Sequence, residues 1–151
     1  MTNDPGPIGG ANIGAACAIF DERGRVLLVK HTYGRLNWEL PGGLALPGEA
    51  PWTTAQRELA EETGLVLDVE RLAGVYFEPG HDFGPMIHFV FRMPRTGADE
   101  PVARPPEIGD VGWFVVDEFP TPFSDFSELR IRDALASDVG YRRIDARKWR
   151  S

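Results

Sequence analysis

Short apolar runs separated by turn residues dominate the first third of the chain. The runs IGAACAIF (13–20) and RVLLVKH (25–31) are divided by DERG, and each has the length and apolar character of a buried strand. This pattern predicts a β-hairpin. WELPGG (38–43) is a short strand that ends in two glycines. Aromatic and β-branched residues predict three further strands, LAGVYF (72–77), MIHFVFRM (86–93) and VGWFVV (111–116).

A helical pattern separates the first strands from the later ones. Pro51 suits the first turn of a helix, a stripe of Ala55, Leu59 and Ala60 follows, and Gly64 is typical of a C-terminal cap. We therefore predict a helix over 51–63, and a second one over SELRIRDALA (127–136). Strands on both sides of a central helix, with another helix at the end, favour a layered α/β or α+β fold.

Length and composition favour a single globular domain. The chain has 151 residues, of which 42% are hydrophobic and 26% charged, values that are ordinary for a globular protein. Because no linker divides it, we expect one domain over 11–151. Residues 1–10 are rich in Gly and Pro, and we expect them to be flexible.

The charge balance limits the classes of partner. A net charge of −7 opposes binding to a nucleic-acid backbone, so we expect no nucleic-acid partner. The single cysteine, Cys17, cannot form an internal disulfide. No stretch approaches the ~20 apolar residues of a membrane span, and the N-terminus lacks the pattern of a secretion signal. We therefore expect a cytoplasmic protein without a membrane contact.

The octapeptide RELAEETG (57–64) holds three carboxylates on one predicted helix. Glu58, Glu61 and Glu62 are spaced i, i+3 and i+4 and share a face, with Arg57 four residues before Glu61. Such a ridge is either an acidic face covered by water or a site for a hard cation such as Mg2+, which prefers oxygen ligands. The octapeptide by itself leaves both interpretations open.

The segment around this ridge resembles the signature of the Nudix hydrolases, G-x5-E-x7-R-E-U-x-E-E-x-G-U, where U is aliphatic. All the specified positions are present, from Gly43 through Glu49 and RELAEETG to Leu65. WELPGG and VGWFVVDEFP also resemble the flanks of that signature, so the resemblance spans about 11–136. It implies an α/β/α sandwich around a mixed β-sheet. One departure is Leu46, where many members carry an additional acid.

The resemblance implies hydrolysis of a nucleoside diphosphate linked to another moiety, with Mg2+, or Mn2+ in its place, as cofactor. By motif position the metal ligands are Glu58, Glu61, Glu62 and a backbone carbonyl at Gly42 or Gly43. Glu49 then supports the site by orienting Arg57 or a ligand, and Arg57 holds carboxylates by bidentate contact.

The general base stays open between two acids, because its place varies within the family. Glu58 is one candidate. Glu107, in the loop PPEIGDVGW, resembles an acid that many members carry at that place, and it is a base, an additional ligand or a solvated loop residue. Another polar cluster lies in FEPGHDFG, with Glu78, His81 and Asp82.

The substrate is only weakly indicated. Members that cleave ADP-ribose often carry a proline about fifteen residues beyond the signature, and Pro79 lies fourteen beyond Leu65. This favours a small ADP-ribose or nucleotide-sugar substrate. Arg35 can meet phosphates, and Trp38 and Phe83 can stack on a base, although such aromatics also pack in cores or at the contact of a homodimer.

Two alternatives to this function remain: a pyrophosphohydrolase of oxidised nucleoside triphosphates, and a non-catalytic nucleotide sensor. The retention of every carboxylate of the signature favours an enzyme. The segment YRRIDARKWR (141–150) carries five basic residues and one acidic residue. This segment either pairs with acidic residues elsewhere in the chain or binds an acidic partner subunit or nucleic acid. We favour the first interpretation.

Overall fold

A computed structural model describes residues 9–95 and 99–151. The prediction of a flexible segment over 1–10 falls mainly on residues outside this range. The elements are β1 (Asn12–Ala18), β2 (Val26–His31), β3 (Trp38–Glu39), β4 (Gly42–Leu44), α1 (Pro51–Thr63), β5 (Arg71–Glu78), β6 (Met86–Arg92), β7 (Ile108–Phe114), β8 (Phe123–Ser124), α2 (Asp125–Leu135), β9 (Gly140–Arg143) and β10 (Trp149–Arg150).

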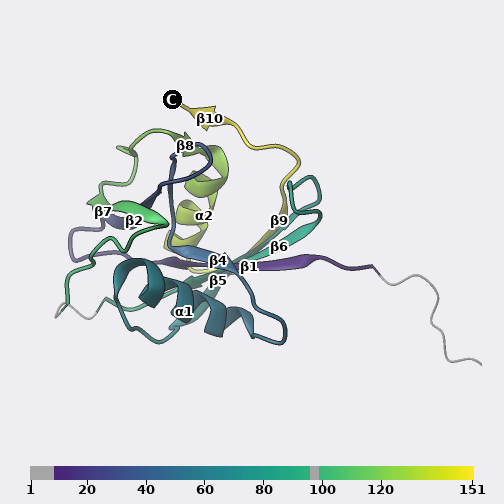
Figure 1. The fold of residues 1–151 in the computed structure, drawn as a ribbon, viewed down its shortest axis with the longest axis horizontal. Helices are drawn as coiled ribbons and strands as arrows, with labels where there is room; N and C mark the ends of the chain where they lie inside the picture. The colour runs from purple at the N-terminus through teal and green to yellow at the C-terminus, as the bar shows by residue number, and fades with distance from the viewer. Residues whose placement is uncertain (1–8, 96–98) are drawn as a thin grey trace, which may run out of the picture.

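The main sheet has the strand order β4-β1-β6-β5-β9 and is mixed, because β1 runs parallel to β6 and β5 parallel to β9 while the other pairs are antiparallel. α1 packs on β1 and β4, and α2 packs on β5 and β6. The two helices lie on opposite faces of this sheet (Figure 1). The predicted α/β fold with a mixed sheet is therefore confirmed.

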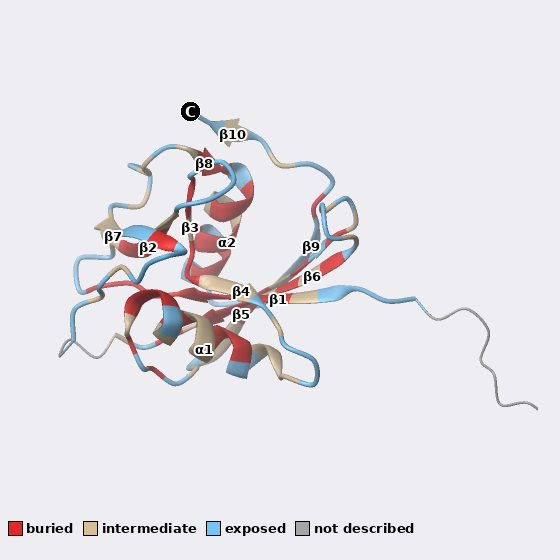
Figure 2. Ribbon diagram, viewed as in Figure 1, coloured by how far each residue is buried: buried red, intermediate tan, exposed pale blue. Residues whose placement is uncertain are grey.

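The side chains of β1 show why the chain forms two cores. Successive side chains of a strand point to opposite faces, so Ala15 and Cys17 join the core under α1, while Ala16 and Ala18 join the core under α2. Both cores bury their apolar residues against this central sheet (Figure 2). Cys17 is fully buried, and its Sγ donates to the carbonyl oxygen of Ala55 at 3.2 Å.

The predicted hairpin of 13–20 and 25–31 is largely wrong. β1 belongs to the five-stranded sheet, whereas β2 lies in a second, antiparallel sheet of order β3-β2-β7. The two runs pair only next to the turn, through a bridge between Phe20 and Val26 and a 3.0 Å bond from Leu27 N to Ile19 O. The runs part because β1 already has β4 and β6 as neighbours on its two edges.

Other boundaries differ less. WELPGG contains two short strands, β3 and β4, which belong to different sheets. β7 begins at Ile108, three residues before the predicted strand, and α2 begins at Asp125 because Ser124 caps it by accepting a bond from Ser127 N at 3.1 Å. Strands β8, β9 and β10 were not predicted, since they are short and polar.

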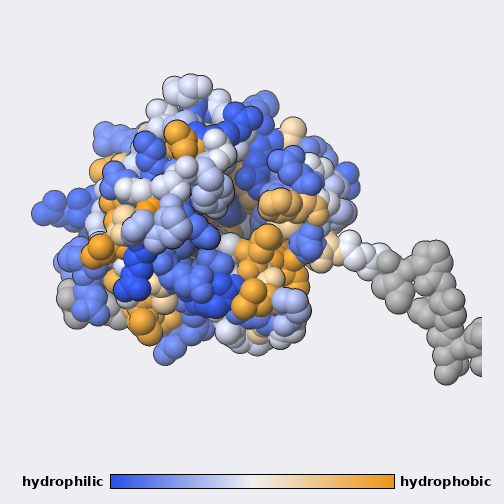
Figure 3. Space-filling model, in the orientation of Figure 1, coloured by the Kyte–Doolittle hydropathy of each residue, from blue (hydrophilic) through white to orange (hydrophobic). Residues whose placement is uncertain are grey.

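Hydrophilic residues predominate on one face of the molecule (Figure 3). On the face shown in Figure 3, hydrophobic residues form small groups among hydrophilic ones. Among the described residues, no helix has the length and apolar character needed to cross a membrane.

Candidate active site

Helix α1 positions the predicted carboxylates at graded depth. It begins at Pro51 and ends at Gly64, which adopts a left-handed conformation with φ 77° and closes the helix through its N–H to Ala60 O. Glu62 is buried with 4% of its surface exposed, the Glu58 side chain is 13% exposed, and the Glu61 side chain is 58% exposed. The ridge therefore runs from the protein interior into solvent.

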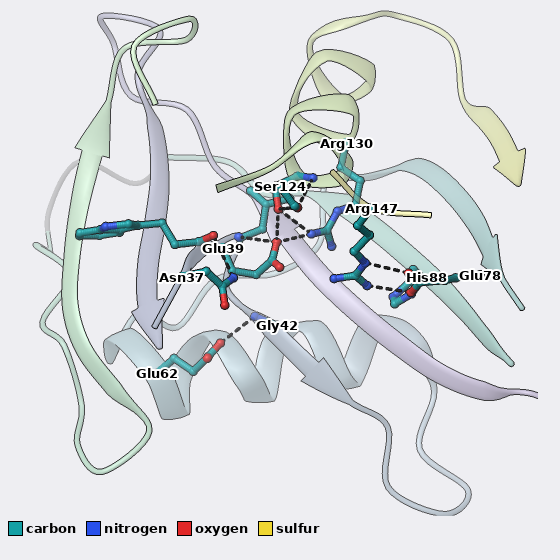
Figure 4. Close-up of polar contacts among 12 residues, drawn as sticks. Asn37, Glu39, Gly42, Glu62, Glu78, His88, Ser124, Arg130 and Arg147 are labelled. Carbon is teal, nitrogen blue, oxygen red and sulfur yellow. Dashed lines mark hydrogen bonds and ion pairs between the residues drawn. The ribbon is translucent and has the colours of Figure 1, made fainter. Parts of the chain in front are cut away.

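Two glycines of β4 allow the ridge to approach the main sheet. A Cβ on Gly43 would lie 2.6 Å from Cδ and Oε1 of Glu58, and a Cβ on Gly42 would overlap the backbone of Ala15 and Ala16 in β1. The backbone N–H of Gly42 donates to Glu62 Oε1 at 2.7 Å (Figure 4). At Gly42 the neighbouring backbone leaves no room for a side chain, whereas at Gly43 a Cβ would displace the end of the Glu58 side chain.

Arg57 holds the acidic side chains around it. Its Nε and one terminal nitrogen bind the two carboxylate oxygens of Glu49 at 2.8 and 2.9 Å. The other terminal nitrogen reaches Glu58 at 3.0 Å and Glu61 at 3.2 Å. Glu49 also accepts from Thr54 Oγ1 at 2.7 Å. The hydrogen bonds from Arg57, followed by that from Thr54, lower the pKa of Glu49 to about 2. The bidentate contact expected of Arg57 is thus present, and it falls on Glu49.

Glu62 is the most perturbed acid of this group. Burial raises its pKa to about 8, against the bond from Gly42 N, and the negative charges of Glu58 and Glu107 act in the same direction as burial. Burial also raises the pKa of Glu58, although Arg57 opposes this. The site therefore holds more negative charge than its arginine compensates, and a cation would relieve that excess.

Glu107 lies in the turn before β7 and is exposed. Its carbonyl oxygen accepts from Thr32 N at 3.0 Å, which fastens this turn to the end of β2. The same loop is bonded to the end of α1, where Arg104 N donates to Glu62 O at 3.1 Å, so the fold brings this loop acid to the same region as the α1 ridge.

A cavity of about 360 Å³ opens on the other side of Gly42 and Gly43. It lies between β1, β4 and β6 on one side and β3, α2 and the C-terminal residues on the other, and its size falls within the range of small-molecule sites. Its lining includes Gly14, Ala15, Ala16, His31, Tyr33, Arg35, Asn37, Glu39, Leu40, Leu44, His81, Asp82, Phe83, Met86, His88, Phe89, Arg130, Arg147 and Trp149.

The predicted substrate residues separate into two groups. Arg35 and Phe83 line the cavity and are exposed at its mouth, as are His81 and Asp82 in part. Trp38 instead lies in the core under α2, with its ring edge-on to Phe114 at 4.9 Å between centroids. The indole is buried there because β3 pairs with β2 and closes the second sheet over it.

Two buried ion pairs beside the cavity were not found by sequence reasoning. Arg130 pairs with Glu39, and Arg147 binds both oxygens of Glu78 at 2.7 Å (Figure 4). In the sequence Arg130 resembles any polar residue of an amphipathic helix, and Glu39 any polar residue of a strand. Only the packing of α2 against β3 places them together, and no local pattern indicates it.

The comparison with known proteins agrees with this geometry. The family model described as NUDIX domain matches residues 11–133. The chain belongs to the Nudix hydrolase family. A MutT-like protein of Streptomyces ambofaciens is 32% identical over 124 residues, which cover 82% of this chain and 77% of that protein. An ADP-ribose pyrophosphatase of Mycobacterium tuberculosis is 50% identical over 54 residues, 33% of this chain and 26% of that protein.

The fold of solved Nudix hydrolases is also similar. The crystal structure of a MutT Nudix hydrolase from Burkholderia pseudomallei has a TM-score of 0.72 at 25% identity, covering 83% of this chain and 98% of that one. Membership in the Nudix family, and with it the interpretation of the chain as a hydrolase, is therefore confirmed. Nudix hydrolases generally use divalent metals.

The donor set of this Nudix enzyme fits such a metal. Carboxylate and carbonyl oxygens are the ligands that hard divalent cations prefer. Within residues 9–95 and 99–151, no three acidic, histidine or cysteine side chains stand grouped as a metal cluster. Arg57 holds Glu58 and Glu61, and Gly42 N holds Glu62. A cation would compete with these contacts for the same oxygens.

Proposed function

We propose that this Nudix hydrolase cleaves the phosphoanhydride bond of a nucleoside diphosphate linked to another moiety, with Mg2+, or Mn2+ in its place. One observation carries the proposal. Gly42 and Gly43 line the nucleotide-sized cavity and also contact the carboxylates of α1, with Glu62 on Gly42 N and Glu58 against Gly43. A diphosphate at this border would meet the acidic ridge while the rest of the substrate occupies the cavity.

The residues that would hold the metal are Glu58, Glu61, Glu62 and the carbonyl of Gly42. A divalent cation at such a site neutralises phosphate charge and lowers the pKa of a bound water. Glu49 keeps Arg57 in position, and Arg57 in turn orients Glu58 and Glu61, which limits the reorganisation that binding requires. In this role Arg57 and Glu49 are positioning residues.

The base is Glu58 or Glu107. In either case its carboxylate accepts a proton from the water that attacks phosphorus, the bond from phosphorus to the bridging oxygen breaks, and a monophosphate leaves. Glu58 lies closest to Gly43 and is engaged by Arg57. Glu107 is exposed and its carboxylate is free to approach the water.

For the substrate we propose ADP-ribose or a nucleotide sugar, in which the attached moiety is a sugar. The Mycobacterium tuberculosis relative, which is an ADP-ribose pyrophosphatase, supports this choice, as does the position of Pro79. The cavity supports a bulky moiety, since its volume exceeds what a diphosphate needs. We also propose that residues 11–151 act as one catalytic domain.

An assay that separates and quantifies the nucleoside monophosphate product tests the reaction, because cleavage of the anhydride in ADP-ribose yields AMP and ribose 5-phosphate and no inorganic phosphate. The panel would contain ADP-ribose, nucleotide sugars, oxidised nucleoside triphosphates and dinucleoside polyphosphates, each with Mg2+ and with EDTA. We expect the protein to hydrolyse ADP-ribose or a nucleotide sugar, and we expect EDTA to abolish this turnover. A preference for oxidised triphosphates would replace the proposed substrate. Binding without turnover of any member would mean that the chain is a sensor.

The variant Glu62→Gln tests the metal site in the same assay. It removes a ligand charge but keeps the side-chain volume and one acceptor oxygen. We expect turnover to fall by about a thousandfold or more, with an unchanged circular dichroism spectrum. Glu70→Gln, an exposed acid beyond the helix, is the matched control. Equal activity of the two variants would show that the metal does not bind at the ridge.

A further inference from the structure

The last residues of the chain form a strap across the molecule, which we define as residues 140–151. This strap lies beyond the end of the family match at residue 133. It begins as β9, which adds to the main sheet beside β5, and it ends as β10, which pairs with β8, the strand directly before α2 (Figure 1). Bonds between Asp125 and Lys148, at 2.9 and 2.8 Å, fasten it there.

The strap contributes two side chains to the cavity, Arg147 and Trp149. Arg147 is anchored from both sides. Its guanidinium binds both oxygens of Glu78, which is 6% exposed, and its carbon Cζ lies 4.7 Å from the centroid of the Phe126 ring. The basic charge of the strap is thus balanced within the chain at this point, as favoured from the sequence, and Arg142 and Arg150 likewise pair with Asp133 and Glu128.

The floor of the cavity is polar but carries little net charge. Each arginine has its own carboxylate, Arg130 with Glu39 and Arg147 with Glu78. Within the part of the chain that the structure describes, Nε of the buried Arg130 has no hydrogen-bond partner. A second phosphate here would face Glu39 and Glu78 as well as the arginines. Neutral groups that donate and accept hydrogen bonds fit this floor better.

The mouth of the cavity offers flat surfaces. Arg35 stacks on the indole of Trp149, with Cζ 4.6 Å from the ring centroid. Two further pairs of rings stand at the rim, His31 with Tyr33 at 4.8 Å and His81 with Phe83 at 5.3 Å between centroids. Planar guanidinium and aromatic groups are the partners on which nucleobases stack.

We propose that the strap determines substrate specificity by holding the nucleoside end: the Arg35–Trp149 stack binds the nucleobase, and Arg147 with the floor of the cavity binds its neutral polar groups. This inference rests on the proposed function for its kinetic consequence. It places the diphosphate, which links the nucleoside to the attached moiety, at the border at Gly42 and Gly43. Arg147 and Trp149 are specificity-determining residues in this arrangement, and neither takes part in the chemistry.

Kinetics of two pairs of variants test the proposal. Trp149→Ala should raise KM for the best nucleotide substrate about tenfold or more, the scale of one lost base stack, with kcat within about twofold. Tyr141→Ala removes an aromatic ring of the same strap that is 89% exposed and should leave both constants unchanged. Arg147→Lys keeps a positive charge opposite Glu78 but loses the bidentate contact, so it should raise KM. The control variant Arg143→Lys should leave KM unchanged. A Trp149→Ala enzyme with unchanged KM would overturn the proposal.

Binding measurements separate this proposal from the reaction itself. Calorimetry with EDTA would compare AMP, GMP, CMP and UMP with ribose 5-phosphate, which shares their phosphate and ribose but lacks a base. We expect at least one nucleotide to bind about tenfold tighter than ribose 5-phosphate, and Trp149→Ala to remove that difference. If the difference is absent in the wild type or survives in the variant, the strap does not bind the base, whether or not the protein hydrolyses any substrate.

Discussion

Arg57 and Glu49 form a two-point ion pair that joins the loop before α1 to the middle of that helix. The guanidinium Nε lies 2.8 Å from one carboxylate oxygen, and a terminal nitrogen lies 2.9 Å from the other. The remaining terminal nitrogen is thereby directed at Glu58 and Glu61. The ion pair thus fixes the orientation of the Arg57 guanidinium, which in turn contacts the carboxylates of Glu58 and Glu61.

Glu49→Gln should therefore weaken metal use without removing a ligand. The amide cannot hold Arg57 at two points as a carboxylate does, so Glu58 and Glu61 lose their orientation. Loss of such an outer contact typically costs about 10–100-fold in metal affinity or activity. A titration of activity with Mg2+ should show a higher half-saturating concentration. An unchanged Mg2+ dependence would assign Glu49 to the stability of the loop alone.

Alanine at the two glycines of β4 should give two different defects, a loss of activity at Gly43 and a loss of stability at Gly42. In Gly43→Ala the new Cβ meets the end of the Glu58 side chain, which can move, so we expect activity to fall by about tenfold or more while the thermal midpoint changes little. In Gly42→Ala the Cβ meets the backbone of β1, which cannot move, so we expect a loss of about 1–3 kcal/mol in unfolding free energy. Thermal unfolding and activity, measured on both variants, separate the two effects.

Stability of the metal-free protein should depend on the protonation of Glu62. Its pKa is raised to about 8 by burial, whereas an unfolded glutamate titrates near the ordinary value of about 4.3. Between these values the folded state binds more protons than the unfolded state, so the unfolding free energy falls as pH rises from about 4.5 to 8. Unfolding in EDTA across this range should show a steeper decline for the wild type than for Glu62→Gln.

Added Mg2+ should restore the unfolding free energy that the metal-free protein loses near pH 8. The cation binds the ionised carboxylate, so it takes the place of the proton and stabilises only the folded protein. We expect the Mg2+-dependent rise in the thermal midpoint to be larger at pH 8 than at pH 6. A rise of equal size at both pH values, in the wild type and in Glu62→Gln, would place the cation elsewhere.

The pH profile of Glu107→Gln should identify the base. If Glu107 accepts the proton from water, its amide variant loses most of kcat and the acidic limb of the profile disappears. If Glu58 is the base, the profile of Glu107→Gln keeps its shape, and only the metal dependence changes. Thr32→Val, which removes the side-chain hydroxyl bonds to the backbone of this turn, controls for displacement of the loop.

The sequence by itself determined the helix α1, the spacing of Glu58, Glu61 and Glu62 on it, and the membership in the Nudix family. These features are local: the period of a helix places residues three and four apart on one face, and the signature is contiguous. The resemblance to that signature also implied that the two glycines, Glu49 and Arg57 belong to one site.

Only the tertiary structure decided which distant residues meet. The apolar runs 13–20 and 25–31 resemble a hairpin, yet they enter different sheets because the edges of β1 are taken by β4 and β6. Trp38 looked available for stacking but is buried by the second sheet, while Arg130, Arg147 and Trp149 looked like surface residues and line the cavity. Strand pairing and the packing of α2 and the strap are long-range contacts, and no pattern within a short segment specifies them.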